Sequence, residues 1–245
     1  VQKAGLAQLE IHQLRNWTAG KHKQIDDMPY GGGPGMVMAC QPWFDALTQL
    51  TQASQAPHII HLTPQGQPLT QERVMQLAQK QHLIFMCGHY EGIDERVIEH
   101  WVDEEICVGD FVVSGGELPA MMVIDAILRV LPGALAAGSV EQDSFYAGLL
   151  DHPHYTRPAE YAGRAVPAVL LGGHHGQIER WRKEQSLERT RLRRPDLYSR
   201  WLRDEEAKKP AGKRISDKTK GVHDGQEIVC TGTREQEEGS SGSDE

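Results

Sequence analysis

The segment His58-Ile-Ile-His-Leu-Thr-Pro-Gln-Gly66 joins a short β-prone run to a Thr-Pro-Gln-Gly turn signal. A helical pattern follows through Leu77 and Ala78, and a second apolar run, Leu83-Ile-Phe-Met-Cys87, ends at Gly88. Strands that alternate with helices are typical of βαβ units, because parallel neighbouring strands need a crossover connection. The pattern therefore predicts an α/β fold with a mostly parallel sheet.

Further along the chain, the pattern changes twice. A long helical run from Glu117 to Leu131 is stopped by Pro132-Gly133, and an Ala- and Gly-rich stretch follows. Residues 148–203 contain two or three helical patterns and no long sheet, and the chain after about Ala207 is poor in apolar residues. We expect an α/β domain, a linker, a small helical domain and a disordered tail, at residues 1–132, 133–147, 148–205 and 206–245.

Composition excludes several classes of protein. The chain has 245 residues, of which 39% are apolar, and no apolar stretch reaches the roughly 18 residues that a membrane span needs. None of the four cysteines forms a CxxC pair, which argues against a disulfide framework or a zinc motif. No basic and apolar signal segment opens the sequence. These features favour a cytoplasmic protein that does not bind membranes.

The net charge of −8 is unevenly distributed. Residues 1–175 carry 10 Lys/Arg and 19 Asp/Glu, residues 176–203 carry 9 and 4, and residues 204–245 carry 7 and 11, which gives −9, +5 and −4. The basic segment also contains Trp181 and Trp201. Cationic side chains between aromatic ones are typical of nucleic-acid binding. An amphipathic helix with its aromatics in a local core fits the composition equally well.

Glycine-rich segments lie where a ligand would bind. The densest, Tyr30-Gly-Gly-Gly-Pro-Gly-Met36, is not followed by Lys, and its proline breaks a dinucleotide fingerprint, so neither phosphate loop fits. Three other loops, at residues 63–66, 88–92 and 109–116, follow apolar runs. Ligands of open α/β sheets bind beyond the carboxyl ends of the strands. Together these loops predict one pocket whose backbone groups suit an adenine ring, although each alone fits an ordinary turn.

Six motifs in order resemble those of the bacterial tRNA (guanine-N1)-methyltransferases, which belong to the knotted SPOUT methyltransferases. The likeness covers roughly residues 5–203. The motifs are Asp26-Asp-Met-Pro-Tyr-Gly-Gly-Gly-Pro-Gly-Met36, Leu62-Thr-Pro-Gln-Gly66, Cys87-Gly-His-Tyr-Glu-Gly-Ile-Asp-Glu-Arg96, Gly109-Asp-Phe-Val-Val-Ser-Gly-Gly-Glu-Leu-Pro119, Asp143-Ser-Phe145 and Gly148-Leu-Leu-Asp-His-Pro-His-Tyr-Thr-Arg-Pro158.

The resemblance implies a fold and an activity. The α/β domain would contain a deep trefoil knot that binds S-adenosylmethionine, and a small all-α C-terminal domain would bind tRNA. A homodimer would build each active site from both chains. The reaction would methylate N1 of the guanosine on the 3′ side of the anticodon. The alternatives are a SPOUT methyltransferase that acts on another RNA position and an inactive RNA-binding fragment.

The chain departs from the family pattern in places. The usual opening strand and helix have no counterpart, so we expect an N-terminally truncated chain that folds or dimerises less well than a complete one. The stretch Arg15-Asn-Trp-Thr18 replaces Arg-Asp-Phe-Thr, Cys107 replaces Ser, and Phe111 replaces Tyr. The tail beyond Ala207 matches nothing in the family.

The resemblance also assigns the site residues. Guanine N1 carries a proton, so methyl transfer needs a base and a cation or donor for the charge that develops on O6. Asp143 would be the base, with a helix N-cap as its structural alternative, and Arg129 would stabilise O6, with an ordinary Arg near a helix end as its alternative. The expected cofactor-binding residues are His61, Leu62, Pro64, Gly88, Tyr90, Glu91, Gly92, Val108, Gly109, Asp110, Phe111, Val112, Val113, Gly115, Gly116 and Pro119.

Basic side chains are the expected tRNA contacts, and no metal site is predicted. Mg²⁺ in catalysis is implied by the resemblance alone, since the sequence shows no clean carboxylate cage, although Glu91 and Asp110 could touch a metal or the cofactor amine. His152, His154, His174 and His175 lack regular ligand spacing. The tRNA-binding residues would be Arg157, Arg180, Arg182, Lys183, Arg189, Arg193 and Arg194.

Overall fold

The computed structural model describes residues 2–18, 21–52, 56–135, 140 and 143–208. Their contacts group Val1–Asp204 into one compact unit and Glu205–Glu245 into a second. Most of the predicted linker interior and almost all of the predicted tail lie outside the described residues. The structure therefore bears on the predicted α/β domain and on the predicted helical domain.

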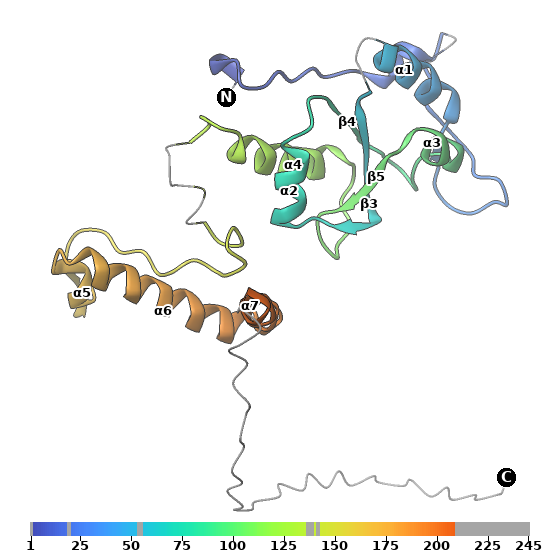
Figure 1. The fold of residues 1–245 in the computed structure, drawn as a ribbon. Coiled ribbons are helices and arrows are strands. Elements are labelled where there is room, and N and C mark those ends of the chain that lie inside the picture. Colours follow the sequence, from blue (N-terminus) through green and yellow to red (C-terminus); the bar gives the residue numbers. More distant parts are fainter. Residues whose placement is uncertain (1, 19–20, 53–55, 136–139, 141–142, 209–245) are drawn as a thin grey trace, which may run out of the picture. The chain divides into compact units, whose positions relative to one another are not determined.

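A parallel sheet of three strands forms the centre of the first unit, in the order β4-β3-β5 (Figure 1). Ile60 in the middle strand pairs with Phe85 on one side and Glu104 on the other. Apolar runs without alternation produce such strands, because helices bury both faces of a parallel sheet. The predicted α/β fold with a parallel sheet is confirmed. The strands are β3 (His58–Pro68), β4 (Leu83–Met86) and β5 (Glu104–Cys107).

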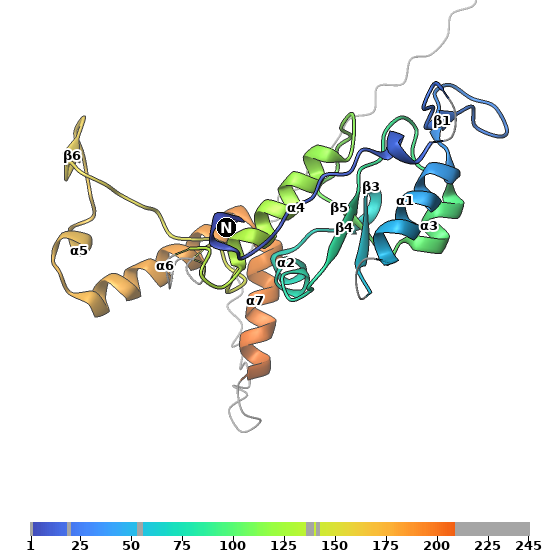
Figure 2. The ribbon, with the colours of Figure 1, turned by 90° about the horizontal axis from the view of Figure 1, so that it is seen from above.

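Helices cover both faces of this sheet. One face is covered by α1 (Cys40–Gln52) and α3 (Glu95–Trp101), and the other by α2 (Gln71–Leu77) and α4 (Glu117–Val130) (Figures 1 and 2). Side-chain caps define two of the starts. The Thr70 hydroxyl accepts a hydrogen bond from the Arg73 amide at 3.2 Å, and the Asp94 carboxylate accepts one from the Arg96 amide at 3.0 Å. No helix of the described part of the chain is long and apolar enough to cross a bilayer.

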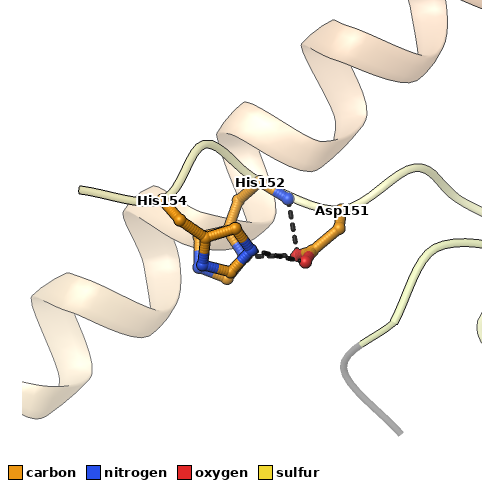
Figure 3. A group of neighbouring side chains, drawn as sticks. All are labelled: Asp151, His152 and His154. Carbon is orange, nitrogen blue, oxygen red and sulfur yellow. Dashed lines mark hydrogen bonds and ion pairs between the residues drawn. The ribbon is translucent and has the colours of Figure 1, made fainter. Parts of the chain in front are cut away.

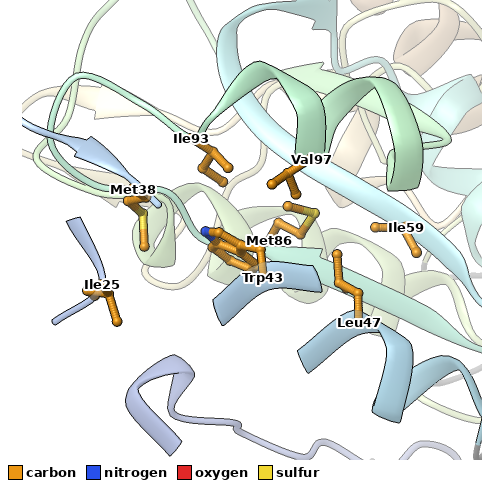
Figure 4. Packing of buried hydrophobic residues seen from close by; sticks show 8 residues of the cluster. All are labelled: Ile25, Met38, Trp43, Leu47, Ile59, Met86, Ile93 and Val97. Carbon is orange, nitrogen blue, oxygen red and sulfur yellow. The ribbon is translucent and has the colours of Figure 1, made fainter. Parts of the chain in front are cut away.

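Two hydrophobic clusters hold the layers together. Successive residues of β3 serve opposite faces, so Ile59 packs with α1 and α3 while Ile60 packs with α2 and α4. The first cluster, drawn in Figure 4, is Ile25, Met38, Trp43, Leu47, Ile59, Met86, Ile93 and Val97. The second is Ile60, Leu62, Val74, Leu77, Ile106, Ala120, Val123 and Ile127.

The segment before the sheet has little regular structure. Two short 3₁₀ helices, Gln2–Ala4 and Leu14–Trp17, precede the antiparallel pair β1 (Asp26–Asp27) and β2 (Val37–Met38). The glycine cluster forms the loop between these two strands. Backbone hydrogen bonds from the Glu91 amide to the Met36 carbonyl (3.0 Å) and from the Met38 amide to the Gly92 carbonyl (2.9 Å) attach this segment to the loop after β4.

The part of the unit beyond residue 148 is not purely helical, which corrects the all-α prediction. A two-stranded hairpin of β6 (Glu160–Tyr161) and β7 (Arg164–Ala165) precedes the helices. Ala162 and Gly163, between the strands, both have positive φ, as a two-residue primed hairpin turn requires. The strand residues are all exposed, so no apolar alternation marked them in the sequence. The helices are α5 (Ala168–Leu171), α6 (His175–Arg193) and α7 (Pro195–Lys208).

Candidate functional site

A cavity of about 260 Å³ opens at the carboxyl ends of the three parallel strands. Its walls come from the end of β3, from the loops after β4 and β5, and from Pro119 on α4. This is the edge of an open α/β sheet at which ligands bind. The predicted cofactor residues all line it, except Asp110. Five further residues line the cavity without having been expected from the sequence: Thr63, His89, Ile106, Cys107 and Ser114.

The missed residues carried a partial signal. Thr63, His89 and Ser114 lie inside the three loops that the sequence predicts to form one pocket. The prediction named other residues of these loops as contacts and not these three. Ile106 and Cys107 end an apolar strand and look like ordinary core residues in the sequence. Only the position of the cavity at the strand end shows that both reach it.

Close backbone approaches lock the walls together. A Cβ at Gly66 would lie 2.5 Å from backbone atoms of Glu105 and Ile106, and a Cβ at Gly116 would lie 2.6 Å from Cys87 Cα. Neither position has room for a side chain, so close packing by itself requires glycine at both. The Gly116 amide also donates to the Gly88 carbonyl at 2.9 Å. Close packing of this kind holds the elements around the cavity against one another.

The rim of the cavity is open and apolar. Phe111 and Val112 are exposed beside Gly109, whose φ of +158° allows the loop to reverse. Tyr90 combines an exposed ring with a φ of +59°, which is rare for an aromatic residue. Strained backbone of this kind concentrates at ligand sites. The rim thus has room for a second molecule to approach the bound ligand.

Two titratable side chains at or beside the cavity have shifted pKa values. Burial lowers the pKa of His61 and outweighs the opposing effect of Glu105, whose Oε1 lies 3.1 Å from Nδ1 of the ring. The ring is therefore neutral at pH 7. Burial raises the pKa of the Cys87 thiol to about 11, with Glu117 adding to the effect. A protonated thiol is a poor nucleophile, which argues against a nucleophilic role for Cys87. Glu91 supplies a carboxylate to the lining.

Arg129 and Asp143 form an ion pair. The Nε and Nη2 atoms of Arg129 donate to Asp143 Oδ2 at 3.1 and 2.6 Å, and both side chains are partly exposed. Residues 144–147 form turns, so Asp143 does not cap a helix. Neither residue belongs to the described cavity lining. The structure therefore brings the two predicted catalytic residues together, but not into the cavity.

The predicted tRNA-binding residues lie mainly on α6. Arg194 instead follows α6 and pairs with Asp196, Nη2 to Oδ2 at 2.6 Å. Arg157 is exposed in the loop before β6. Among the described residues, five cations of α6 have no acidic partner: Arg180, Arg182, Lys183, Arg189 and Arg193.

The aromatic side chains of the basic segment pack locally. The ring of Trp181 lies near those of His152 and Tyr155, and the rings of Tyr198 and Trp201 stack with centroids 6.1 Å apart. The local-core interpretation therefore describes the aromatics, while the cations remain available to solvent.

The sequence as a whole matches a known family. The model of the family described as tRNA (Guanine-1)-methyltransferase TrmD matches residues 1–200. The chain belongs to this family. The resemblance predicted from the motifs is confirmed, and the match ends before the predicted tail.

Curated relatives agree with the family model. A protein of Ruminiclostridium cellulolyticum is 52% identical over 201 residues, which cover 81% of this chain and 86% of the relative. A protein of Bacillus subtilis is 54% identical over 198 residues, which cover 80% and 82%. Each carries the name tRNA (guanine-N(1)-)-methyltransferase.

One further group of side chains stands out in this tRNA (guanine-1)-methyltransferase family member. Asp151, His152 and His154 bring their ligand atoms within 4.8 Å of one another (Figure 3). The sequence-based prediction considered four histidines together as candidate metal ligands and did not include Asp151. The adjacent carboxylate, in the order Asp-His-Pro-His, is the signal that could have found the group.

Proposed function

We propose that the chain transfers a methyl group from S-adenosylmethionine to N1 of the guanosine on the 3′ side of the anticodon in tRNA. Its family membership carries the reaction class, since its curated relatives are named tRNA (guanine-N(1)-)-methyltransferases. The strand-end cavity, with its glycine-rich walls, supports the cofactor assignment. A tRNA-modifying enzyme of this kind works in the cytoplasm.

The cavity lining fits this cofactor. S-adenosylmethionine supplies an electrophilic methyl group on a positively charged sulfonium. Backbone groups of the loops around Gly88, Gly109 and Gly115 are available to the edges of an adenine ring, and glycine lets a ligand approach them closely. The neutral ring of His61 adds no repulsive positive charge, and the carboxylate of Glu91 is suited to a cationic ligand. The volume of about 260 Å³ lies just below the range of about 300–1,000 Å³ that is usual for small-molecule sites.

Asp143 and Arg129 have complementary roles in the proposed reaction. The Asp143 carboxylate takes the proton from guanine N1 as the methyl arrives. The Arg129 guanidinium stabilises the negative charge that develops on O6. Both Arg129 donors point to Asp143 Oδ2, so the ion pair positions the base before substrate binds and must loosen when guanine O6 takes over a donor.

The described residues offer few carboxylate ligands to Mg²⁺. Among the described residues, the one group of three neighbouring metal-ligating side chains is Asp151, His152 and His154, and it contains a single carboxylate. Mg²⁺ prefers oxygen ligands and keeps several waters. We infer that a catalytic Mg²⁺ would take few ligands from this chain, with Glu91 and Asp110 as candidates.

A homodimer is also part of the proposal. The outer face of α4 exposes Leu118, Met121 and Met122, which are 63%, 64% and 53% accessible, and the cavity rim adds Phe111 and Val112. Apolar surface of this kind marks an interaction site. A second copy that covers this face would complete the active site beside the cavity.

The trefoil knot and the tRNA-binding domain complete the proposal. The knot rests on family membership alone. In the structure, Gly66 packs against β5, and the Leu69 amide donates to the Cys107 carbonyl at 2.8 Å. Both contacts bring the end of β3 against β5, which follows β3 in the chain after two crossover connections. The helices of residues 148–205 would bind tRNA through their unpaired cations.

Labelled cofactor tests the reaction directly. The full chain is incubated with methyl-labelled S-adenosylmethionine and a tRNA transcript that has two guanosines on the 3′ side of its anticodon, and the digested product is analysed. We expect the label in 1-methylguanosine at the position next to the anticodon. A matched transcript with adenosine at that position should remain unlabelled. Label at another nucleoside would favour the alternative RNA target, and cofactor binding without transfer would favour an inactive fragment.

Binding of tRNA should depend steeply on salt. Phosphate contacts release counterions, so log K falls linearly with log salt concentration, and each lost contact reduces the slope by about 1. We expect Arg182→Gln to weaken binding severalfold and to flatten the slope, measured by filter binding over a salt series. Arg191→Gln is the matched control, because Arg191 already pairs with Glu188 at 2.7 Å. Equal effects of the two variants would contradict the assignment.

A further inference from the structure

The carboxylate of Asp151 lies between two imidazole rings. Its Oδ1 atom is 2.6 Å from His152 Nδ1, and its Oδ2 atom is 2.7 Å from His154 Nε2 (Figure 3). His152 is buried, Asp151 is half-buried, and His154 is exposed. One nitrogen of each ring therefore points toward the same carboxylate.

These atoms are the ligands that zinc prefers. One carboxylate oxygen and two imidazole nitrogens form a facial set, and a water can complete a tetrahedron. We propose that Asp151, His152 and His154 bind a divalent transition-metal ion of the zinc class. Zn–N bonds of about 2.0–2.1 Å at tetrahedral angles separate ligand atoms by about 3.3 Å. The present contacts of 2.6 and 2.7 Å would open by about 0.6–0.7 Å to reach that separation, and all three residues already hold ligand atoms within 4.8 Å of one another.

The surroundings of the group favour zinc over magnesium or calcium. Arg182 of α6 is close enough to His152 to act on it electrostatically, and its positive charge opposes any cation. A hard ion held by a single carboxylate would gain little against that repulsion, since Mg²⁺ and Ca²⁺ require six or more oxygen ligands. Two imidazole bonds offset the repulsion for a borderline-soft ion.

The segment that carries the ligands is already anchored to α6. The Leu150 amide donates to Thr190 Oγ1 at 2.9 Å, the Leu150 carbonyl accepts from Ser186 Oγ at 2.5 Å, and Thr190 is fully buried. The His152 ring meets Trp181 in a T-shaped contact with centroids 6.5 Å apart. Anchoring on one helix fixes two of the three ligands before the ion binds, which reduces the entropy lost on binding.

The proposed ion would also hold the segment next to Asp143. The Asp151 amide donates to Ser144 Oγ at 2.9 Å, and Ser144 directly follows Asp143 in the chain. An ion that fixes Asp151 therefore restrains the Ser144 side chain through this bond. The site is structural, because none of its ligands lines the cofactor cavity.

Zinc alone is the probe that tests the site. The full chain, without a histidine tag and stripped with a chelator, is titrated with Zn²⁺ in competition with a chromophoric chelator. We expect one ion per chain, and visible absorption typical of tetrahedral coordination when Co²⁺ replaces Zn²⁺. His154→Gln, at an exposed position, should weaken binding at least tenfold and abolish the Co²⁺ absorption. His175→Gln, which changes another exposed histidine, should leave both unchanged.

The outcomes separate the proposal from its alternatives. Zinc should raise the melting temperature of the unmodified chain and of His175→Gln, but not of His154→Gln, because only a bound ion stabilises the folded state. Asp151→Asn, which keeps one oxygen but loses the charge, should bind with intermediate affinity. Equal zinc affinity in His154→Gln and the unmodified chain would overturn the proposal, and so would the absence of stoichiometric binding. Neither measurement depends on methyl transfer.

Discussion

Replacing Asp143 with Asn should lower kcat for methyl transfer by about 10²–10⁴-fold, the range that a positioned general base contributes. The amide has the same shape and can still accept a hydrogen bond from Arg129, but it cannot take the N1 proton. Cofactor affinity should not change, because Asp143 does not belong to the described cavity lining. Single-turnover rates at saturating tRNA and cofactor measure the first effect, and calorimetry measures the second.

A matched variant separates the loss of a base from a general loss of charge. Asp125 lies one turn before Arg129 on the same helix, so Asp125→Asn removes a nearby carboxylate that has no assigned role. Its turnover should stay within a fewfold of the unmodified chain. Near-normal turnover of Asp143→Asn would refute Asp143 as the base. Arg129→Lys, which keeps the charge but loses the planar guanidinium with its two donor nitrogens, should reduce kcat by less than Asp143→Asn does.

Local patterns were sufficient to predict the cavity. Three of the walls follow short apolar runs that indicated buried strands, and each of these runs leads into a loop that contains glycine, as at Gly88 and Gly109. In a parallel sheet such loops must gather at one edge, so three local signals combine into one site. Asp110 is the exception, since a residue inside a loop can point to either side of it, and sequence does not decide which.

Some local side-chain pairings could not be predicted in this way. The pairing of Arg194 with Asp196 depends on side-chain directions at the junction of α6 and α7. The hairpin at Ala162-Gly163 is too short and too exposed to leave an apolar pattern. The proposed knot is further from reach, because a knot contradicts the general rule that chains do not thread through loops. Only the family resemblance indicates it.

Gly66→Ala should destabilise the chain by about 3 kcal/mol, at the upper end of the usual cost of overpacking. The added Cβ would lie 2.5 Å from backbone atoms of Glu105 and Ile106. Backbone of β5 cannot move away without disturbing its pairing with β3, whereas a flexible side chain could rotate aside. A loss of this size lowers the melting temperature by roughly 6–12 °C in a chain of this length. Thermal unfolding followed by circular dichroism measures it.

The same substitution should weaken cofactor binding, because Ile106 and Cys107 of the displaced strand line the cavity. Gly176→Ala is the control, since a Cβ there meets nothing within 4 Å and alanine favours a helix by up to about 1 kcal/mol. Its melting temperature should stay level or rise. If Gly66→Ala melts like the unmodified chain, the end of β3 does not press against β5. If it melts early but binds cofactor normally, the contact stabilises the fold without shaping the cavity.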